Sequence, residues 1–244
     1  MASWFEGFFE TDDWLAVALA RPAERTAAEV EFLVRQLPAG ARVLDVHCGT
    51  GRHAVALAER GYAVAGLDIS ARVLEVARAG APGADFRQGD MRELPWPDES
   101  FDAVLNLWTA FGYFETQEED ERVLREAARV LVPGGRLVIE TINQAGLLRT
   151  FRPRSWSEDD AGTLMLEEVE YDLTTGRSSA RWTFVRPDGS RSELAFDHRL
   201  YAPVEYGDML RRAGLRPVTF LGDIDESPLT LESRRLIVVA ERAA

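Results

Sequence analysis

Residues 43–51 read Val43-Leu44-Asp45-Val46-His47-Cys48-Gly49-Thr50-Gly51. The first of these residues belong to a short apolar segment, residues 42–46, that predicts a buried β-strand. The residues after it predict a tight glycine turn, because glycine adopts left-handed backbone angles and lets a ligand approach the main chain closely. A helix is predicted next, over residues 52–60. A strand, a glycine turn and a helix begin a βαβ unit, so this stretch indicates a parallel sheet.

Strands and helices alternate on both sides of this stretch. Further helices are predicted over residues 21–37, 70–79, 118–131 and 204–213, and further strands over 62–67, 84–88, 101–107, 136–141, 217–221 and 236–240. This alternation is typical of a doubly wound α/β sheet. From about residue 150 the pattern changes to three longer strands at 164–171, 177–185 and 191–201, joined by turns that contain Thr175-Gly176 and Pro187-Asp188-Gly189. We expect an antiparallel meander at residues 151–201, inserted into one domain made of residues 1–150 and 202–244.

The composition limits the classes of partner. The chain has 244 residues and a formal net charge of −13, which disfavours binding to nucleic acid or to an anionic membrane surface. Its one cysteine, Cys48, excludes an internal disulfide and a cysteine-rich zinc site, and we expect no metal. No apolar run approaches the roughly 18 residues of a membrane span. These features predict a cytoplasmic protein that acts on a small molecule.

The glycine turn leaves two ligand classes open. Asp68 ends the second strand, where a carboxylate can accept both hydroxyls of an adenosine ribose. Gly49, Gly51 and Ala54 also match the pattern of a nicotinamide-dinucleotide site, which predicts an oxidoreductase. Asp45 discriminates between the two, because its carboxylate would repel a pyrophosphate and attract an ammonium group. The sequence therefore favours a nucleoside that carries a cationic group and no diphosphate.

Five ordered motifs extend this interpretation. They are Val43–Gly51, Gly66–Asp68, Gly89–Met91, Phe101–Val104 and Leu131–Leu137. With these five motifs in this order, the chain resembles the class I S-adenosylmethionine-dependent methyltransferases. The resemblance implies S-adenosylmethionine (SAM) as cofactor, S-adenosylhomocysteine (SAH) as product, and a seven-stranded sheet of order 3-2-1-4-5-7-6 with strand 7 antiparallel.

The resemblance also implies which residues bind the cofactor. Those assigned to the methionine group are Asp45, Gly49 and Gly51; those assigned to ribose and adenine are Asp68, Ile69, Asp90 and Met91; and Leu107 and Trp108 close the floor of the site. His47 departs from the family, which usually has glycine or another small residue there. We expect His47 to narrow the pocket near the methionine group or to reach its carboxylate.

No motif identifies the methyl acceptor. The candidates that could bind it are Phe111, Tyr113, Asn143, Arg152 and Arg154, and the candidates for catalysis are Tyr113 and His198. For the aromatic residues the alternative is ordinary packing of a loop, and for the arginines it is a solvated surface paired with Glu158 and Asp159. For His198 the alternative is a half-exposed residue on a strand. Trp4 and Phe5 could cover the cofactor or form a packed terminal segment.

These observations favour a SAM-dependent methyltransferase that acts on a small-molecule nitrogen or oxygen nucleophile. No Asp-Pro-Pro-Tyr or Asn-Pro-Pro-Tyr segment follows the fourth strand, which disfavours methylation of a flipped DNA base. A non-catalytic SAM- or SAH-binding protein and a nicotinamide-dependent oxidoreductase stay as alternatives. The meander could cover the site or pair two subunits as a homodimer.

Overall fold

The computed structural model describes residues 4–243; within this range, the side chains of Trp4 and Glu6 lie outside the described part, so the predicted role of Trp4 does too. The helices are α1 (Trp4–Phe8), α2 (Asp12–Leu19), α3 (Ala23–Gln36), α4 (Arg52–Ala58), α5 (Ala71–Gly80), α6 (Gln117–Val130), α7 (Gln144–Arg149) and α8 (Pro203–Arg212). The strands are β1 (Arg42–Val46), β2 (Ala63–Asp68), β3 (Asp85–Gln88), β4 (Phe101–Asn106), β5 (Leu131–Ile142), β6 (Arg154–Glu158), β7 (Leu164–Asp172), β8 (Arg177–Val185), β9 (Arg191–Arg199), β10 (Leu215–Leu221) and β11 (Arg235–Arg242).

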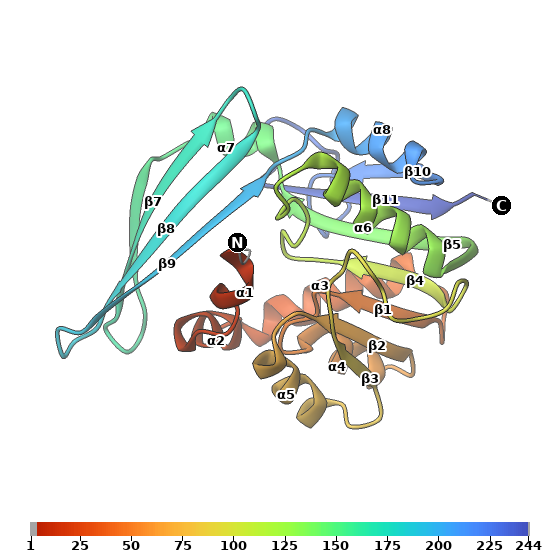
Figure 1. The fold of residues 1–244 in the computed structure, drawn as a ribbon, viewed down its shortest axis with the longest axis horizontal. Coiled ribbons are helices and arrows are strands. Elements are labelled where there is room, and N and C mark those ends of the chain that lie inside the picture. The colour runs from red at the N-terminus through yellow and green to blue at the C-terminus, as the bar shows by residue number, and fades with distance from the viewer. Residues whose placement is uncertain (1–3, 244) are drawn as a thin grey trace.

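The main sheet has the predicted strand order. Seven strands pair in the order β3-β2-β1-β4-β5-β11-β10, and β11 runs antiparallel to both of its neighbours. The five strands β1–β5 pair in parallel, so their carboxyl ends lie at one edge of the sheet, on the side of the second sheet (Figure 1). This is the edge at which doubly wound folds bind ligands.

Helices cover both faces of the main sheet because successive strand residues point to opposite sides. In β4, Val104 packs with α6 and α8, whereas Ala103 and Leu105 pack with α3, α4 and α5. Strand β5 begins five residues before the predicted start and includes Pro133-Gly134-Gly135, where its pairing with β4 has an irregularity. The helix predicted over residues 118–131 therefore ends where β5 begins, and the irregular pairing lies at the start of this strand.

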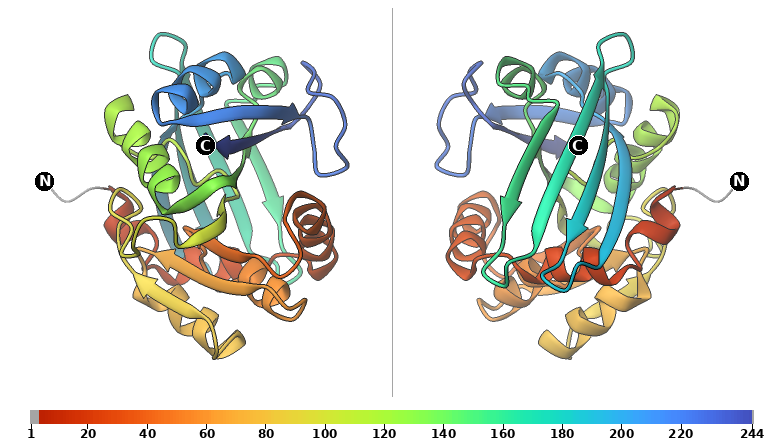
Figure 2. Two further views of the ribbon diagram at one scale, coloured as in Figure 1. Left: turned by 90° about the vertical axis from the view of Figure 1, so that its right-hand side faces the viewer. Right: turned by 90° about the vertical axis from the view of Figure 1, so that its left-hand side faces the viewer.

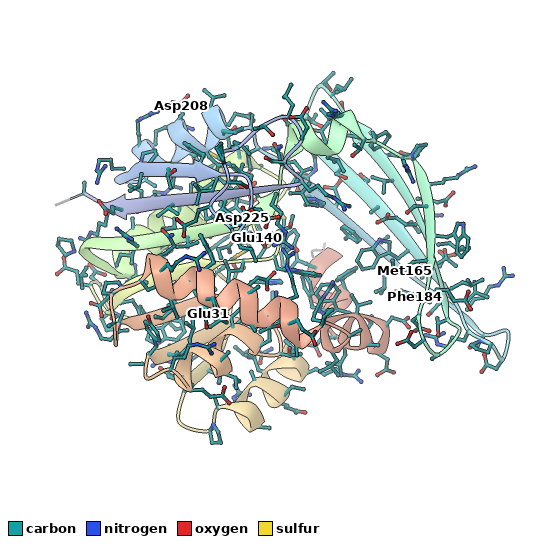
Figure 3. The ribbon with its side chains drawn as sticks, turned by 180° about the vertical axis from the view of Figure 1, so that it is seen from behind. Glu31, Glu140, Met165, Phe184, Asp208 and Asp225 are labelled. Atoms are coloured by element: carbon teal, nitrogen blue, oxygen red, sulfur yellow. The ribbon has the colours of Figure 1, made fainter. Side chains whose placement is uncertain are left out.

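The meander has one strand more than predicted. Strands β6, β7, β8 and β9 form a second, antiparallel sheet, which stands across the carboxyl-end edge of the main sheet (Figure 2). Every residue of β6 is exposed, so this strand lacks the alternation of apolar and polar residues that predicts strands. On the inner face, Met165 and Phe184 point toward the rest of the molecule (Figure 3).

The N-terminal helices lie between the two sheets. Both α1 and α2 contact β9, and Asp13 of α2 pairs with Arg186 at the β8–β9 turn. Phe5, Phe8 and Phe9 are buried in the same core cluster as α6 and α8. The segment around residues 5–9 therefore packs over the ligand edge of the main sheet. In residues 4–243 no helix is long and apolar enough to span a membrane.

Candidate active site

The glycine turn after β1 has the backbone that its sequence predicts. Gly49 and Gly51 have φ of 55° and 75°, and His47 has φ of 65°. A Cβ atom at Gly51 would lie 2.8 Å from the Cβ of Ala77, so helix α5 packs directly against this glycine. The left-handed angle at His47 gives a physical reason for glycine at the equivalent position of other proteins, and histidine is among the residues that tolerate it.

A pocket of about 60 Å³ lies against this turn, and we call it the glycine-turn pocket. The predicted residues that line it are Asp45, His47, Gly49, Asp68, Leu107 and Trp108. The carboxylate of Asp68 accepts hydrogen bonds from the Gly49 N–H at 2.8 Å and the Ser70 N–H at 3.0 Å. Asp68 therefore connects the glycine turn to the start of α5.

Four buried polar atoms around the glycine-turn pocket have no hydrogen-bond partner within residues 4–243. They are Asp45 Oδ2, His47 Nε2, Arg21 Nε and Arg52 Nη2. Burial raises the pKa of Asp45 to about 7, and burial also lowers the pKa of Arg21 to about 10. The unpaired oxygen of Asp45 beside unpaired nitrogens of Arg21 and Arg52 fits a zwitterionic amino-acid group, with its ammonium at Asp45 and its carboxylate at the arginines. Arg52 also pairs with Glu29 through Nη1.

A smaller pocket of about 20 Å³ continues from there along the ends of β2 and β3. Its lining includes the predicted residues Asp68, Ile69, Asp90 and Met91 and the aromatic rings of Phe5, Phe9 and Phe114. The Asp90 carboxylate accepts hydrogen bonds from the Arg92 backbone N–H and side chain, which fixes its orientation. Apolar rings next to oriented carboxylates suit a base and a ribose.

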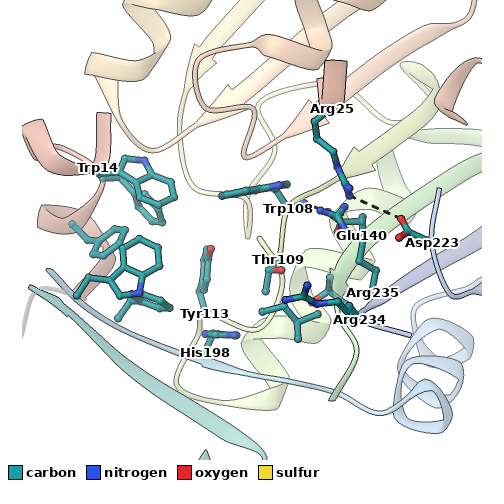
Figure 4. A pocket seen from close by; sticks show the side chains of 16 residues that line it. Trp14, Arg25, Trp108, Thr109, Tyr113, Glu140, His198, Asp223, Arg234 and Arg235 are labelled. Carbon is teal, nitrogen blue, oxygen red and sulfur yellow. Dashed lines mark hydrogen bonds and ion pairs between the residues drawn. The ribbon is translucent and has the colours of Figure 1, made fainter. Parts of the chain in front are cut away.

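A third, larger cavity of about 560 Å³ lies between the two sheets, and we call it the inter-sheet cavity (Figure 4). Aromatic side chains from α2, β8 and β9, among them Trp14, Trp182 and Phe196, form one end. Arg25, Arg234 and Arg235 lie at the other end with Glu140 and Asp223. Trp108 and Tyr113 line both this cavity and the glycine-turn pocket, so the two spaces adjoin.

His198 lies on the wall of the inter-sheet cavity. It is 5% exposed, and neither ring nitrogen has a hydrogen-bond partner among the described residues. Its ring stacks on Phe196 and meets the edge of Tyr113, with ring centroids 5.9 and 6.4 Å apart. Burial and the positive charge of Arg177 lower the pKa of His198 to about 4. The alternative of a half-exposed strand histidine is wrong.

Several predicted acceptor residues lie elsewhere. Phe111 is 1% exposed and packs against Tyr201 and Tyr206 in the core. The Asn143 amide donates hydrogen bonds to the carbonyl oxygens of Thr230 and Ser233, so it holds the turn before β11. These two residues serve packing and do not line the inter-sheet cavity.

The predicted arginine cluster is dispersed over the surface. Arg154 is paired with Glu168 on the outer face of the second sheet, and Arg149 is paired with Glu232. Arg152 is exposed and lines none of the three pockets described above. The alternative pairing with Glu158 and Asp159 is also wrong, because neither acid contacts these arginines within residues 4–243.

Sequence reasoning missed most of the charged residues of the site. Arg21 lies just before α3, and its guanidinium carbon lies 3.3 Å from the centroid of the Trp108 ring. Arg25, Arg235 and Glu140 come from three different elements. The one signal available was Pro22, which places Arg21 immediately before a helix start. No group of three metal-ligating side chains occurs within the described range.

The fold and these pockets define a class of protein: an α/β enzyme that binds a nucleoside with an amino-acid group, next to a cavity for a second small molecule. Comparisons with known proteins agree. Residues 44–139 match the methyltransferase domain family. The chain is 31% identical over 216 residues to a dTDP-4-amino-2,3,4,6-tetradeoxy-D-glucose N,N-dimethyltransferase of Saccharopolyspora spinosa, which covers 84% of this chain and 83% of that protein.

Two solved structures share the fold over nearly the whole chain. The CcbJ methyltransferase from Streptomyces caelestis is 25% identical with a TM-score of 0.85, covering 98% of this chain and 99% of that one. The sugar N-methyltransferase KedS8 from Streptoalloteichus sp. ATCC 53650 is 28% identical with a TM-score of 0.72, covering 90% and 88%. The chain belongs to the class I SAM-dependent methyltransferases, and SAM is its cofactor.

Proposed function

We propose that this enzyme transfers a methyl group from SAM to a nitrogen or oxygen atom of a small molecule bound in the inter-sheet cavity. The observation that carries the proposal is the adjacency of the two spaces across Trp108 and Tyr113. Where the two spaces meet, a methyl donor in one and a nucleophile in the other would be close enough for an in-line displacement. An amine acceptor is favoured, because the Saccharopolyspora spinosa relative is named as an N,N-dimethyltransferase of an amino sugar nucleotide and KedS8 as a sugar N-methyltransferase.

For the cofactor we propose the arrangement that the unpaired charges support. Asp45 binds the ammonium group and Arg21 the carboxylate of the methionine portion. Asp68 binds the ribose, and Ile69, Asp90 and Met91 surround the adenine. When bound, SAM supplies an electrophilic methyl group on a sulfonium, so the protein need only align the nucleophile and exclude water.

For the acceptor we propose that His198 orients the nucleophile and takes its proton. The imidazole is neutral near pH 7, so one ring nitrogen can accept a hydrogen bond from an N–H or O–H group. In the transfer, the lone pair of that nitrogen or oxygen would form the new bond to the methyl carbon while the carbon–sulfur bond breaks and leaves SAH, and the proton would pass to His198. Burial raises the pKa of Tyr113, so its phenol stays protonated and lines the site as a polar group rather than acting as a base.

The charged end of the inter-sheet cavity suits a polar acceptor, and the aromatic end suits its apolar body. The second sheet supplies Trp182, Phe196 and His198 and thereby covers the acceptor. We propose this covering role for residues 151–201, inserted into a domain of residues 1–150 and 202–244.

The first experiment is thermal unfolding with excess SAH, with NADH as control. At 100 times the dissociation constant SAH adds about 2.7 kcal/mol of stability, which is a shift of roughly 5–11 °C for a chain of this size. Turnover is then measured as SAH release from SAM in the presence of each member of a panel of small amines and alcohols. Stabilisation by SAH with no turnover across the panel would favour a non-catalytic binding protein, and stabilisation by NADH alone would favour the oxidoreductase alternative.

A further inference from the structure

The turn after β4, Leu107–Ala110, forms the wall between the glycine-turn pocket and the inter-sheet cavity, and its backbone is unusual. Trp108 has φ of 66° and Thr109 has φ of 59°, so two successive non-glycine residues are left-handed. This conformation is unfavourable for residues with a side chain, and most of all for a β-branched one such as threonine. The turn keeps it only where other groups hold the backbone in place.

Glu140, near the end of β5, holds both residues. Its Oε2 accepts a hydrogen bond from the Trp108 N–H at 2.7 Å, and its backbone oxygen accepts one from the Thr109 N–H at 2.9 Å. The side chain is buried, and Arg235 lies 2.5 Å from its Oε1. A buried carboxylate with one cationic partner and one backbone donor is satisfied on both oxygens.

The position of Trp108 matters on both sides of the wall. Its indole lies against the guanidinium of Arg21, which lines the glycine-turn pocket with an unpaired Nε. The same indole lines the inter-sheet cavity (Figure 4). A change in the backbone of Trp108 would therefore move the cation that faces the cofactor and the wall that faces the acceptor together.

We propose that Glu140 is a positioning residue for methyl transfer: by holding Trp108 and Thr109 left-handed, it places the Trp108 indole and Arg21 at the boundary between cofactor and acceptor. The inference rests on the proposed placement of the cofactor in the glycine-turn pocket. It predicts that Glu140 affects SAH binding through the backbone of the turn, because Glu140 lines the inter-sheet cavity and not the glycine-turn pocket.

The test measures SAH affinity, so it does not require the acceptor to be known. Glu140→Ala keeps the backbone bond to Thr109 but leaves the Trp108 N–H without its partner, and we expect the dissociation constant for SAH to rise about tenfold. Thr109→Gly added to Glu140→Ala should lower that constant again by at least about threefold, because glycine is left-handed without strain. A purely structural role for Glu140 would show no such recovery.

Glu121→Ala is the matched control. Glu121 is as buried as Glu140, at 7% exposed each, and it pairs with Arg212 away from the pockets. It should lower the unfolding temperature and leave SAH affinity unchanged. If Glu140→Ala does not fold, Glu140→Gln retains an acceptor oxygen for Trp108 and should show a smaller loss with the same recovery by Thr109→Gly.

Two results would overturn the inference: SAH affinity of the folded Glu140 variant within twofold of wild type, or no recovery in the double variant. Failure of the wild-type enzyme to bind SAH would instead refute the proposed cofactor site.

Discussion

The glycine-turn pocket and the inter-sheet cavity share a wall but are assembled differently. The carboxylates of the first come from the carboxyl ends of β1 and β2, with Asp45 and Asp68 placed by adjacent parallel strands, and Arg21 reaches it from the segment before α3. The second draws its lining from α2, α3, β5, β8, β9 and the segments before β11. The first pocket has a local framework of strand ends and a glycine turn, whereas the second exists only when distant segments pack together.

This difference teaches where each half can vary. A nucleoside site tied to a strand end and a glycine turn changes little without breaking the fold, because Gly51 packs on α5 and Asp68 bonds the turn itself. The cavity wall of Trp182, Phe196 and His198 comes from a separate sheet that can change its side chains without disturbing β1. Under the proposed arrangement, the first half would determine the methyl donor and the second half the acceptor.

The largest expected effect is a loss of SAH affinity on substitution of Asp68, which belongs to the glycine-turn pocket. Asp68→Ala removes the proposed ribose ligand and leaves the N–H groups of Gly49 and Ser70 without their partner. We expect SAH affinity to fall at least about 100-fold, measured by calorimetry. Asp102→Ala is the control, because Asp102 also accepts a backbone N–H bond, from Arg42, at the opposite end of the sheet. Equal losses in both variants would mean that Asp68 acts through the fold alone.

The next effect should appear only in turnover. His198→Gln keeps a polar side chain in the inter-sheet cavity but removes the proton acceptor, so kcat should fall about 100-fold with SAH affinity unchanged. Because the folded-state pKa of about 4 lies below the ordinary 6.5, the histidine also costs stability as pH falls from 6.5 to 4. The variant should lose this acid sensitivity. Glu193→Gln, on the exposed face of the same strand, should change neither property; unchanged kcat in His198→Gln would remove His198 from the mechanism.

The contrast between local and distant contacts also explains how much of the fold and of the site the sequence predicts. The strand order and the carboxylates at strand ends follow from local patterns, because β1 and β2 are short apolar runs that each end at or beside an aspartate. The arginines of the site do not, since Arg21 and Arg235 are more than 200 residues apart and meet only after packing. No periodic pattern marks either of them.

The loop between β4 and α6 shows the limit most clearly. Phe111 and Tyr113 are two residues apart in one aromatic segment, yet Phe111 enters the core and Tyr113 lines all three pockets. Between them Gly112 has φ of 100°, and its carbonyl accepts the Arg199 N–H at 2.7 Å. A contact with a strand almost 90 residues away decides which ring faces the ligand.

The pH dependence of SAH affinity and of folding stability should distinguish the glycine-turn pocket from the inter-sheet cavity. Burial raises the pKa of Asp45 to about 7, so the carboxyl is protonated below that pH and cannot pair with an ammonium group. SAH affinity should therefore increase about tenfold from about pH 5.5 to about 7.5. The protonated Asp45 carboxyl contributes stability to the fold that is lost as pH rises through about 7. His198 has the opposite effect, since it costs stability as pH falls. Asp45→Asn should abolish the pH dependence of SAH binding; its persistence would assign it to another group.

The smallest expected effect tests whether the acceptor binds between the sheets at all. An open groove of about 610 Å³ on the outer face of the second sheet offers a rival site, lined by Arg154, Glu168, Arg181 and Asp197 among others. Arg154 is 82% exposed there and paired with Glu168, and an ion pair so exposed contributes little to binding or stability. We expect Arg154→Gln to leave kcat and the acceptor KM within about twofold of wild type, like the control Arg191→Gln at another exposed position of the second sheet.

The inter-sheet cavity has the buried histidine and the shared wall with the cofactor, whereas the groove lies behind the sheet and away from the glycine turn. A tenfold rise in acceptor KM in Arg154→Gln alone would move the acceptor to the outer face and leave His198 without a role in its binding.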